Sequence, residues 1–106
     1  MSHRVVLCTC PPDVAEGIAR QVVEGRIAAC VNIVPAVQSV YRWEGKMCAD
    51  AESLLIIKTT SSRVSELTER LLEIHPYDVP EVIALPIESD VGNSRYLQWL
   101  TAESEG

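Results

Sequence analysis

Phenylalanine and long hydrophobic runs are absent from this sequence of 106 residues. Without Phe, the side chains of Val, Ile, Leu and Ala must fill the core, which suits β-strands and amphipathic helices. No apolar run approaches the length of a membrane span, and the start, Met1–Arg4, lacks a signal-peptide cleavage pattern. We therefore expect a cytoplasmic protein without a membrane partner. The length predicts a single domain over residues 1–106.

Positive charge is also scarce. Nine Lys and Arg stand against 15 Asp and Glu, which gives a formal net charge of −6. This balance argues against nucleic acid or an anionic membrane as the main partner, and it is compatible with cation binding. The chain also has no glycine-rich phosphate-binding loop.

The four cysteines form no CxxC pair and have irregular spacings. In a chain expected in a reducing compartment, neither a disulfide framework nor a zinc knuckle is favoured. Cys8 and Cys10 lie two residues apart on a predicted strand and therefore face the same side. We expect both to be small buried residues.

The chain divides into two similar halves, each with a strand, a helix and a second strand. In the first half, strands are predicted over residues 5–9 and 27–34. Between them, Asp13 resembles a helix N-cap, Glu16 completes a capping-box pattern, and Gly25 provides a stop. Val, Ile and Val side chains at i+4 spacing would form the inner stripe of this helix.

The second half repeats the pattern with strands over residues 54–59 and 82–86. Its helix begins at Ser61 or Ser62, and Pro76 ends it. Two βαβ units in series predict an α+β protein with the ferredoxin-like split βαβ fold, in the order βαββαβ. Right-handed crossovers place both helices on one face of the sheet.

Two further elements complete the prediction. A short C-terminal helix is expected over residues 94–100, with Asn93 as its N-cap. Between the halves, Trp43–Lys46 is a turn signal with Gly45 at a position that tolerates positive φ, inside a long central hairpin. A two-stranded arm of this kind is marginally stable alone in water, so we expect it to pack against another copy of the chain.

Five blocks of sequence, in order and with matching gaps, closely resemble the CutA divalent-cation tolerance proteins. The blocks are Ala29–Asn32, Tyr41–Lys46, Leu55–Thr59, His75–Glu81 and Tyr96–Trp99. The resemblance implies a ferredoxin-like fold, a cytoplasmic homotrimer built through the long hairpins, and a shape like that of the PII signalling proteins. It also implies a link to copper and other divalent metals. Cys10 and Cys48 depart from the family pattern.

Three residues in or near these blocks are candidate metal ligands. Cys30 offers a soft thiolate, although a buried structural cysteine is the alternative. His75 offers an imidazole at a stiff Pro-containing loop, although it could instead satisfy the last carbonyls of the helix. Glu81 offers a carboxylate, or an ion pair with Lys58.

The remaining candidates concern a crevice between subunits. The resemblance suggests that Trp43 and Tyr96 line it together with Lys58, although ordinary packing also explains aromatic side chains. The sequence favours a non-enzymatic metal-tolerance protein. The alternative is a PII-like sensor that binds a small anion in the crevice, with Arg42, Lys46 and Lys58 supplying charge. A Cys30–His75 enzyme is the least favoured hypothesis.

Overall fold

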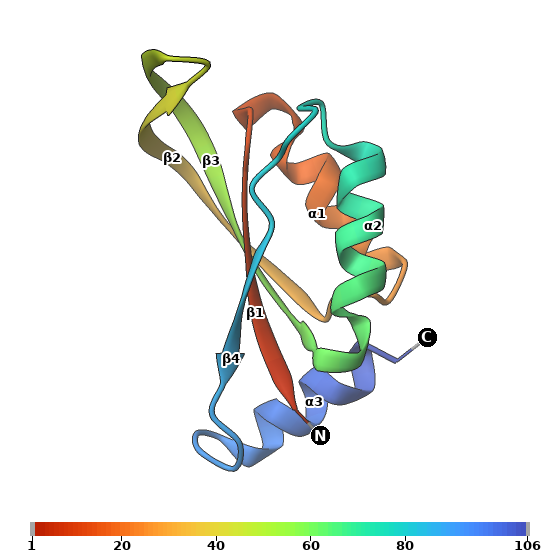
Figure 1. Cartoon of the computed structure of the whole chain (residues 1–106). Helices are drawn as coiled ribbons and strands as arrows, with labels where there is room; N and C mark the ends of the chain where they lie inside the picture. The colour runs from red at the N-terminus through yellow and green to blue at the C-terminus, as the bar shows by residue number, and fades with distance from the viewer. Residues whose placement is uncertain (1, 106) are drawn as a thin grey trace.

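The computed structural model describes residues 2–105 as a four-stranded antiparallel sheet with three α-helices. Helices α1 and α2 lie side by side on one face of the sheet, and α3 lies at the end near the N-terminus (Figure 1). The elements are β1 (His3–Cys10), α1 (Ala15–Glu24), β2 (Cys30–Trp43), β3 (Lys46–Thr60), α2 (Val64–Ile74), β4 (Ile83–Ile87) and α3 (Ser94–Glu103).

The strand order is β2-β3-β1-β4, so the two halves of the chain interleave at the centre of the sheet. β1 pairs antiparallel with both β3 and β4, and β2 pairs antiparallel with β3. In each βαβ unit the two strands are not neighbours, because one strand of the other unit lies between them. This is the predicted split βαβ arrangement.

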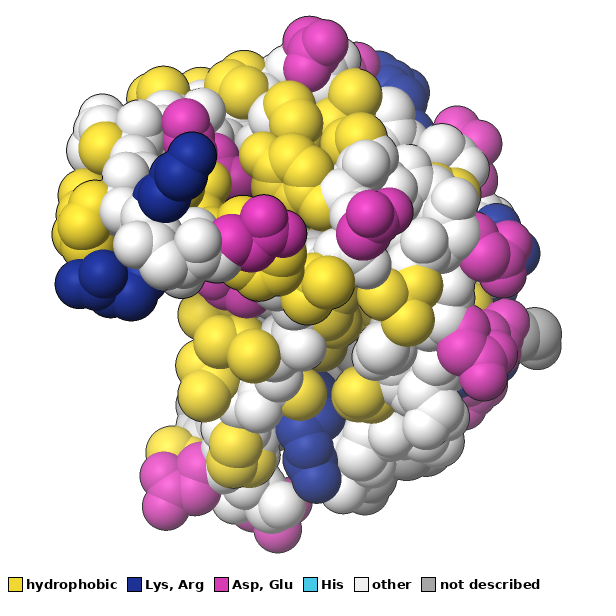
Figure 2. Space-filling view, turned by 45° about the horizontal axis from the view of Figure 1, so that its top comes forward, with side chains coloured by type: hydrophobic (Ala, Val, Ile, Leu, Met, Phe, Trp, Pro, Cys, Tyr) yellow, Lys and Arg dark blue, Asp and Glu magenta, His cyan; other side chains and the backbone are white. Residues whose placement is uncertain are grey.

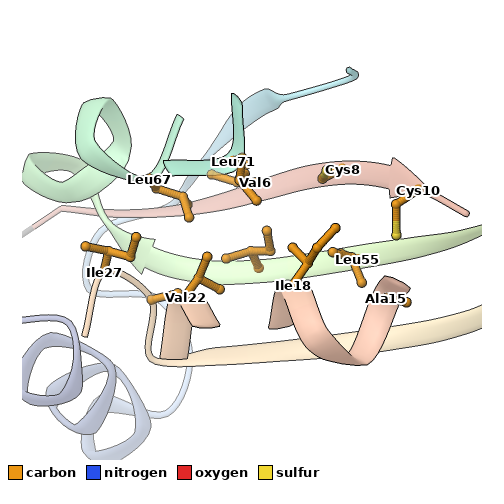
Figure 3. Packing of buried hydrophobic residues seen from close by; sticks show 12 residues of the cluster. Val6, Cys8, Cys10, Ala15, Ile18, Val22, Ile27, Leu55, Leu67 and Leu71 are labelled. Atoms are coloured by element: carbon orange, nitrogen blue, oxygen red, sulfur yellow. The ribbon is translucent and has the colours of Figure 1, made fainter. Parts of the chain in front are cut away.

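The core lies between the sheet and helices α1 and α2 (Figure 3). Val6, Cys8 and Leu55 point from the sheet toward the helices. The predicted inner stripe of α1 is confirmed, since Ile18 and Val22 are buried in this cluster. Leu67 and Leu71 of α2, one turn apart, complete it. The predicted burial of Cys8 and Cys10 is also confirmed.

The predicted central hairpin is not a separate arm but the continuation of β2 and β3, which run for 14 and 15 residues. Its two-residue turn joins the pair Trp43 and Lys46, with φ of 50° at Glu44 and 79° at Gly45. Positive φ at both central residues defines a type I′ turn, which matches the twist of the strands. The prediction of positive φ at Gly45 is confirmed.

The hairpin leaves the rest of the sheet at an irregularity in β2, where the register with β3 shifts between Val34 and Val37. Pro35 lies at this point, which suits a residue that cannot donate to a ladder. The Pro35 carbonyl instead accepts a 2.9 Å hydrogen bond from the Ser53 hydroxyl of β3. A bulge increases local bend and twist, and it therefore directs the hairpin away from the body of the protein.

The expected capping box at the start of α1 is wrong. Pro12 and Asp13 belong to a short 3-10 helix, and no side chain caps α1, whose N-cap is Val14. The two consecutive prolines begin this tighter turn early, so Asp13 lies inside it rather than before α1. Glu16 instead forms a 2.8 Å ion pair with Arg20, one turn along the helix.

Helix ends follow the sequence more closely elsewhere. Gly25 is the C-cap of α1, but the left-handed conformation falls on the next residue, Arg26, with φ of 59°. His75, which precedes Pro76, is extended and ends α2, as the steric effect of a following proline requires. The side chain of Asn93 accepts hydrogen bonds from two backbone amides of α3, which confirms the predicted cap. α3 itself extends about one turn beyond residue 100.

The sheet face opposite α1 and α2 is apolar and largely uncovered. The register pairs Val5 with Leu85 and Leu7 with Ile83 on this face. Leu85 is 48% exposed and Ile83 is 51% exposed. α3 covers only one end of the face, where Nε2 of His3 lies 2.8 Å from the Thr101 hydroxyl. We call this the open face.

Within residues 2–105, none of the helices combines the length and the apolar character needed to cross a bilayer.

Candidate functional site

A groove of about 690 Å³ lies between the hairpin and the loop that follows α2. Tyr41 and Trp43 of β2 form one wall, and Tyr77 and Glu81 of the loop form the other. Glu52 of β3 also lines the groove, near the point where the hairpin leaves the sheet. In Figure 2, hydrophobic and acidic side chains gather where the projecting hairpin meets the body of the protein. The volume is within the range of small-molecule sites.

His75 fixes the loop that forms one wall of the groove. Its ring is buried, with Nε2 2.8 Å from the Thr9 carbonyl of β1, and Nδ1 accepts a 3.1 Å hydrogen bond from the Tyr77 amide. A carbonyl can only accept, so Nε2 carries the proton and the imidazole is neutral. Both nitrogens are thereby occupied. In this arrangement His75 holds the loop against β1 and has no lone pair free for a metal ion.

Two tyrosines of the groove donate to carboxylates of β3. The Tyr77 hydroxyl donates to Oε2 of Glu52 at 2.9 Å, and the Tyr41 hydroxyl donates to Oδ2 of Asp50 at 2.5 Å. Partial burial and the bond to Glu52 raise the pKa of Tyr77 to about 12. The hydrogen bond to Asp50 raises the pKa of Tyr41 as well. Both phenols therefore stay neutral and act as donors at physiological pH.

A second group of polar residues lies on the open face, at the start of β2. Cys30 pairs with Lys58 across β2 and β3, and Lys58 bonds to the side-chain oxygen of Asn32. Tyr96 of α3 lies near this group: burial, and then the neighbouring Cys30 thiol, raise its pKa. The Tyr96 ring also packs against Trp99, with 5.5 Å between ring centroids. The thiol of Cys30 is half-buried rather than sealed in the core.

The three predicted metal ligands do not meet within one chain. Cys30 is in register with Lys58, which pairs with Val5, whereas His75 contacts β1 at Thr9. Val5 and Thr9 are four positions apart along β1, a distance of about 13 Å at about 3.3 Å per residue. Among residues 2–105, no three His, Cys, Asp or Glu side chains are placed to hold a metal ion together. One chain alone therefore does not fit a closed metal site.

The remaining predicted residues are also divided. Trp43 and Glu81 line the groove, whereas Lys58 and Tyr96 lie beside Cys30 on the open face. The expected Lys58–Glu81 ion pair is not formed, because the register directs Lys58 to Asn32 instead.

All four cysteines are free thiols. Burial, and then the nearby Cys10, Glu81 and Glu52, raise the pKa of Cys8 to about 12. Burial also raises the pKa of Cys10, followed by the charges of Glu52 and Asp13. A thiol that stays protonated is a poor nucleophile and a poor metal ligand, so Cys8 and Cys10 act as core residues.

Sequence reasoning missed Glu52, which lines the groove, and the pairing of Tyr41 with Asp50. Glu52 is only 7% exposed, although a carboxylate near the middle of a long strand gives no local sign of burial. Tyr41 and Asp50 were not recognised as a pair. Their link follows from the hairpin register, in which Tyr41 opposes Cys48, two residues from Asp50 on the same face. Assigning the strand register of the hairpin from the sequence would have revealed the Tyr41–Asp50 pair, whereas the Tyr77–Glu52 contact depends on the whole fold.

The fold and the groove define a ferredoxin-like α+β protein with an exposed apolar sheet face and a projecting hairpin. The family described as "CutA1 divalent ion tolerance protein" matches residues 4–103. The chain belongs to the CutA family.

Individual relatives agree with this assignment. The chain is 56% identical over 93 residues to the "Protein CutA homolog" of Xenopus laevis, covering 87% of this chain and 60% of that protein's length. It is 53% identical over 99 residues to the "Divalent-cation tolerance protein CutA" of Thermus thermophilus, covering 92% of this chain and 94% of the relative. The solved structure of the Thermus protein matches with a TM-score of 0.91 at 49% identity, over 97% of this chain and 99% of that one.

A further solved structure links the fold to another group of proteins. The "PII-like protein CutA from Nostoc sp. PCC 7120 in apo form" matches with a TM-score of 0.91 at 33% identity. The match covers 96% of this chain and 97% of the Nostoc chain. The fold is therefore that of the CutA and PII-like proteins, as the sequence predicted.

Proposed function

We propose that this protein is a cytoplasmic homotrimer that contributes to divalent-ion tolerance by binding a divalent metal ion, copper first, without catalysing a reaction. The observation that carries the proposal is the open face, on which apolar strand residues are exposed and the half-buried thiol of Cys30 lies beside Lys58. Membership in a family described by divalent-ion tolerance supports the choice of ligand.

The open face supports self-association. A soluble monomer rarely leaves one whole face of a sheet apolar, because burial of such a surface stabilises by about 25 cal/mol per Å². Ile83 and Leu85 are about half exposed on β4, and Met47 is more than half exposed on the hairpin. A second and a third copy of the chain would cover these residues, and a closed ring satisfies every copy equally.

Metal binding then requires ligands from more than one subunit. Cys30 is the best single donor, since its half-buried thiol faces the surface that other copies would cover. Copper favours soft thiolate and imidazole ligands. Glu81 is exposed and free to contribute a carboxylate. His75 can contribute only if its ring gives up the contact with Thr9 or with Tyr77.

The separation of Cys30 from His75 also supports a non-enzymatic role. A thiolate–imidazole pair must lie within hydrogen-bond reach. Cys30 is paired with Lys58 of β3 and His75 contacts Thr9 of β1, and these two positions are about 13 Å apart along the sheet. The loop after β1 contains Pro11 and Pro12, which supply no backbone donor for an anionic intermediate.

A second candidate is a PII-like sensor that binds a small anion between subunits. The similarity to the Nostoc PII-like protein favours it, together with the position of Lys58 on the open face. Arg42 and Lys46 are on the hairpin and do not belong to the same group of residues. A thermal-shift screen with organic anions, repeated with Lys58→Ala, tests this candidate, because a ligand of the folded state raises the melting temperature.

Two measurements test the main proposal. Light scattering coupled to size-exclusion chromatography should give the mass of three chains, and Leu85→Glu on the open face should reduce it. A monomeric wild-type protein at micromolar concentration would contradict the trimer.

Titration calorimetry with copper should then show binding that Cys30→Ser weakens and Cys48→Ser, the matched half-buried control, does not. Equal affinities for wild type and Cys30→Ser would remove Cys30 from the site.

A further inference from the structure

The groove between the hairpin and the loop after α2 has a one-sided charge. Three of its lining residues are carboxylates, Glu52, Asp78 and Glu81. Within the described part of the chain, no Lys or Arg lines it. A concave surface of one sign concentrates counter-ions of the opposite sign, so the groove attracts a cation and repels an anion.

Aromatic rings form much of the remaining wall. Tyr41 and Trp43 come from the hairpin, and Tyr77 comes from the opposite side. The hydroxyls of both tyrosines are held by carboxylates, which restrains the rings. The faces of such rings attract organic cations, and a combination of aromatic walls and carboxylates is typical of sites for ammonium groups.

Glu52 gives the groove a partly buried charge with unused capacity. Its side chain is more than nine-tenths buried, and it lines the groove. Oε2 accepts from Tyr77, while Oε1 has no hydrogen-bond partner among residues 2–105. A carboxylate oxygen that receives no hydrogen bond from the protein can accept one from a ligand. An ammonium N–H from a ligand would supply that hydrogen bond.

We propose that the groove binds a small organic amine that carries two or more ammonium groups. Its volume of about 690 Å³ suits an extended molecule rather than a bare ion. One ammonium group would pair with Glu52 at the inner end, and a second would lie among Trp43 and the loop carboxylates Asp78 and Glu81. The methylene chain between the ammonium groups would pack on the aromatic rings. This inference does not depend on copper binding at Cys30.

The test uses the full-length protein in its natural assembly, with spermidine as the probe in titration calorimetry at an ionic strength of about 0.1 M. Saturable binding is expected, and Trp43→Ala and Glu81→Gln should each weaken it by about tenfold or more. Two matched controls lie outside the groove: Trp99→Ala on α3 and Glu73→Gln on α2. These controls should change the affinity by less than about twofold, since surface charges are screened beyond about 10 Å.

Three results would overturn the proposal. They are the absence of saturable spermidine binding, an equal loss in the control variants, or displacement of spermidine by magnesium at matched ionic strength. An equal loss in the control variants, or displacement by magnesium, would mean that spermidine binds only by non-specific attraction to negative charge. Light scattering of the wild type and copper titration of Cys30→Ser separate this outcome from failure of the proposed function, because neither measurement changes a residue that lines the groove.

Discussion

The hydroxyl of Tyr77 donates a 2.9 Å hydrogen bond to Oε2 of Glu52 and so joins the loop after α2 to the base of the hairpin. The two residues are 25 positions apart in the sequence. Their bond closes one end of the groove and gives a buried carboxylate a donor. The same loop is fixed on its other side by His75, which contacts Thr9 and the Tyr77 amide. The wall of the groove is therefore held from two directions.

Replacement of Tyr77 by Phe should destabilise the protein by about 1–2 kcal/mol, because the buried Glu52 loses its donor. Tyr41→Phe is the matched control. It also removes a phenol–carboxylate bond, but on the exposed hairpin, and should lower stability less than Tyr77→Phe does. Urea unfolding of both variants measures the difference. Equal effects would mean that the burial of Glu52 does not matter.

The tyrosines also predict a stability change at alkaline pH. The pKa of Tyr77 is raised to about 12, and those of Tyr41 and Tyr96 are raised as well. The folded protein therefore holds the phenolic proton more tightly than the unfolded chain, whose pKa is about 10. As pH rises from about 10 to about 12, the unfolded chain ionises first and the free energy of unfolding falls.

Absorbance at 295 nm reports phenolate directly. The native protein should ionise well above the midpoint of the same protein in urea, and urea unfolding at pH 8 and pH 11 should show the loss of stability. Superimposable titrations of native and unfolded protein would contradict the raised pKa values. Tyr77→Phe should remove part of the pH dependence.

Local patterns in the sequence were enough to predict the fold. The i+4 spacing of Val14, Ile18 and Val22 identified the inner face of α1, and the Gly45 turn identified the hairpin. Each of these signals depends on neighbours in the chain. Asp13 was misjudged because two preceding prolines impose a 3-10 turn, which overrides the capping preference.

The site was predicted less well because it depends on register and on long-range packing. Glu81 and Lys58 seemed natural partners by charge, but pairing of β2 with β3 places Lys58 beside Asn32 and Cys30. His75 was correctly located at the loop, whereas the occupation of both ring nitrogens could not be read from sequence. Glu52 was missed because nothing next to it in the chain indicates the Tyr77 hydroxyl that helps to bury it.

The hairpin turn contains one residue, Glu44, whose replacement should stabilise the protein. Glu44 has φ of 50°, a conformation that costs an L-residue with a longer side chain about 1 kcal/mol and that Asn adopts more readily. Glu44→Asn should therefore stabilise the protein by about 0.5–1 kcal/mol. Glu88→Asn, outside the turn, controls for the loss of one negative charge. Thermal unfolding at matched ionic strength should show a higher melting temperature only for Glu44→Asn.

The reactivity of each cysteine should follow its burial. Cys8 and Cys10 are buried with raised pKa values, whereas Cys48 is half-buried on the hairpin. Iodoacetamide at pH 8 should modify Cys48 in the native protein and leave Cys8 and Cys10 unmodified, because the thiolate is the reactive species. In urea all of them should react. Peptide mass spectrometry assigns the modified sites, and early modification of Cys8 would contradict its place in the core.

The docking of α3 depends on Arg26, which adopts positive φ and directs its side chain to the end of that helix. Nε donates to the Glu105 carbonyl at 2.7 Å, and Nη2 donates to the Ala102 carbonyl at 2.8 Å. A cation at a helix C-terminus also interacts favourably with the helix dipole. Arg26→Ala should therefore loosen the last turn of α3 without unfolding the sheet.

Hydrogen exchange measured by mass spectrometry should show faster exchange in α3 for Arg26→Ala and unchanged exchange in β1 and β3. Arg26→Lys retains the charge but not the two-pronged geometry of the guanidinium, so it should give an intermediate result. If Lys protects α3 as fully as Arg, charge at the helix end is sufficient and the two specific hydrogen bonds are not required. Because Tyr96 of α3 is a neighbour of Cys30, loosening of the helix should also make the Cys30 thiol easier to alkylate.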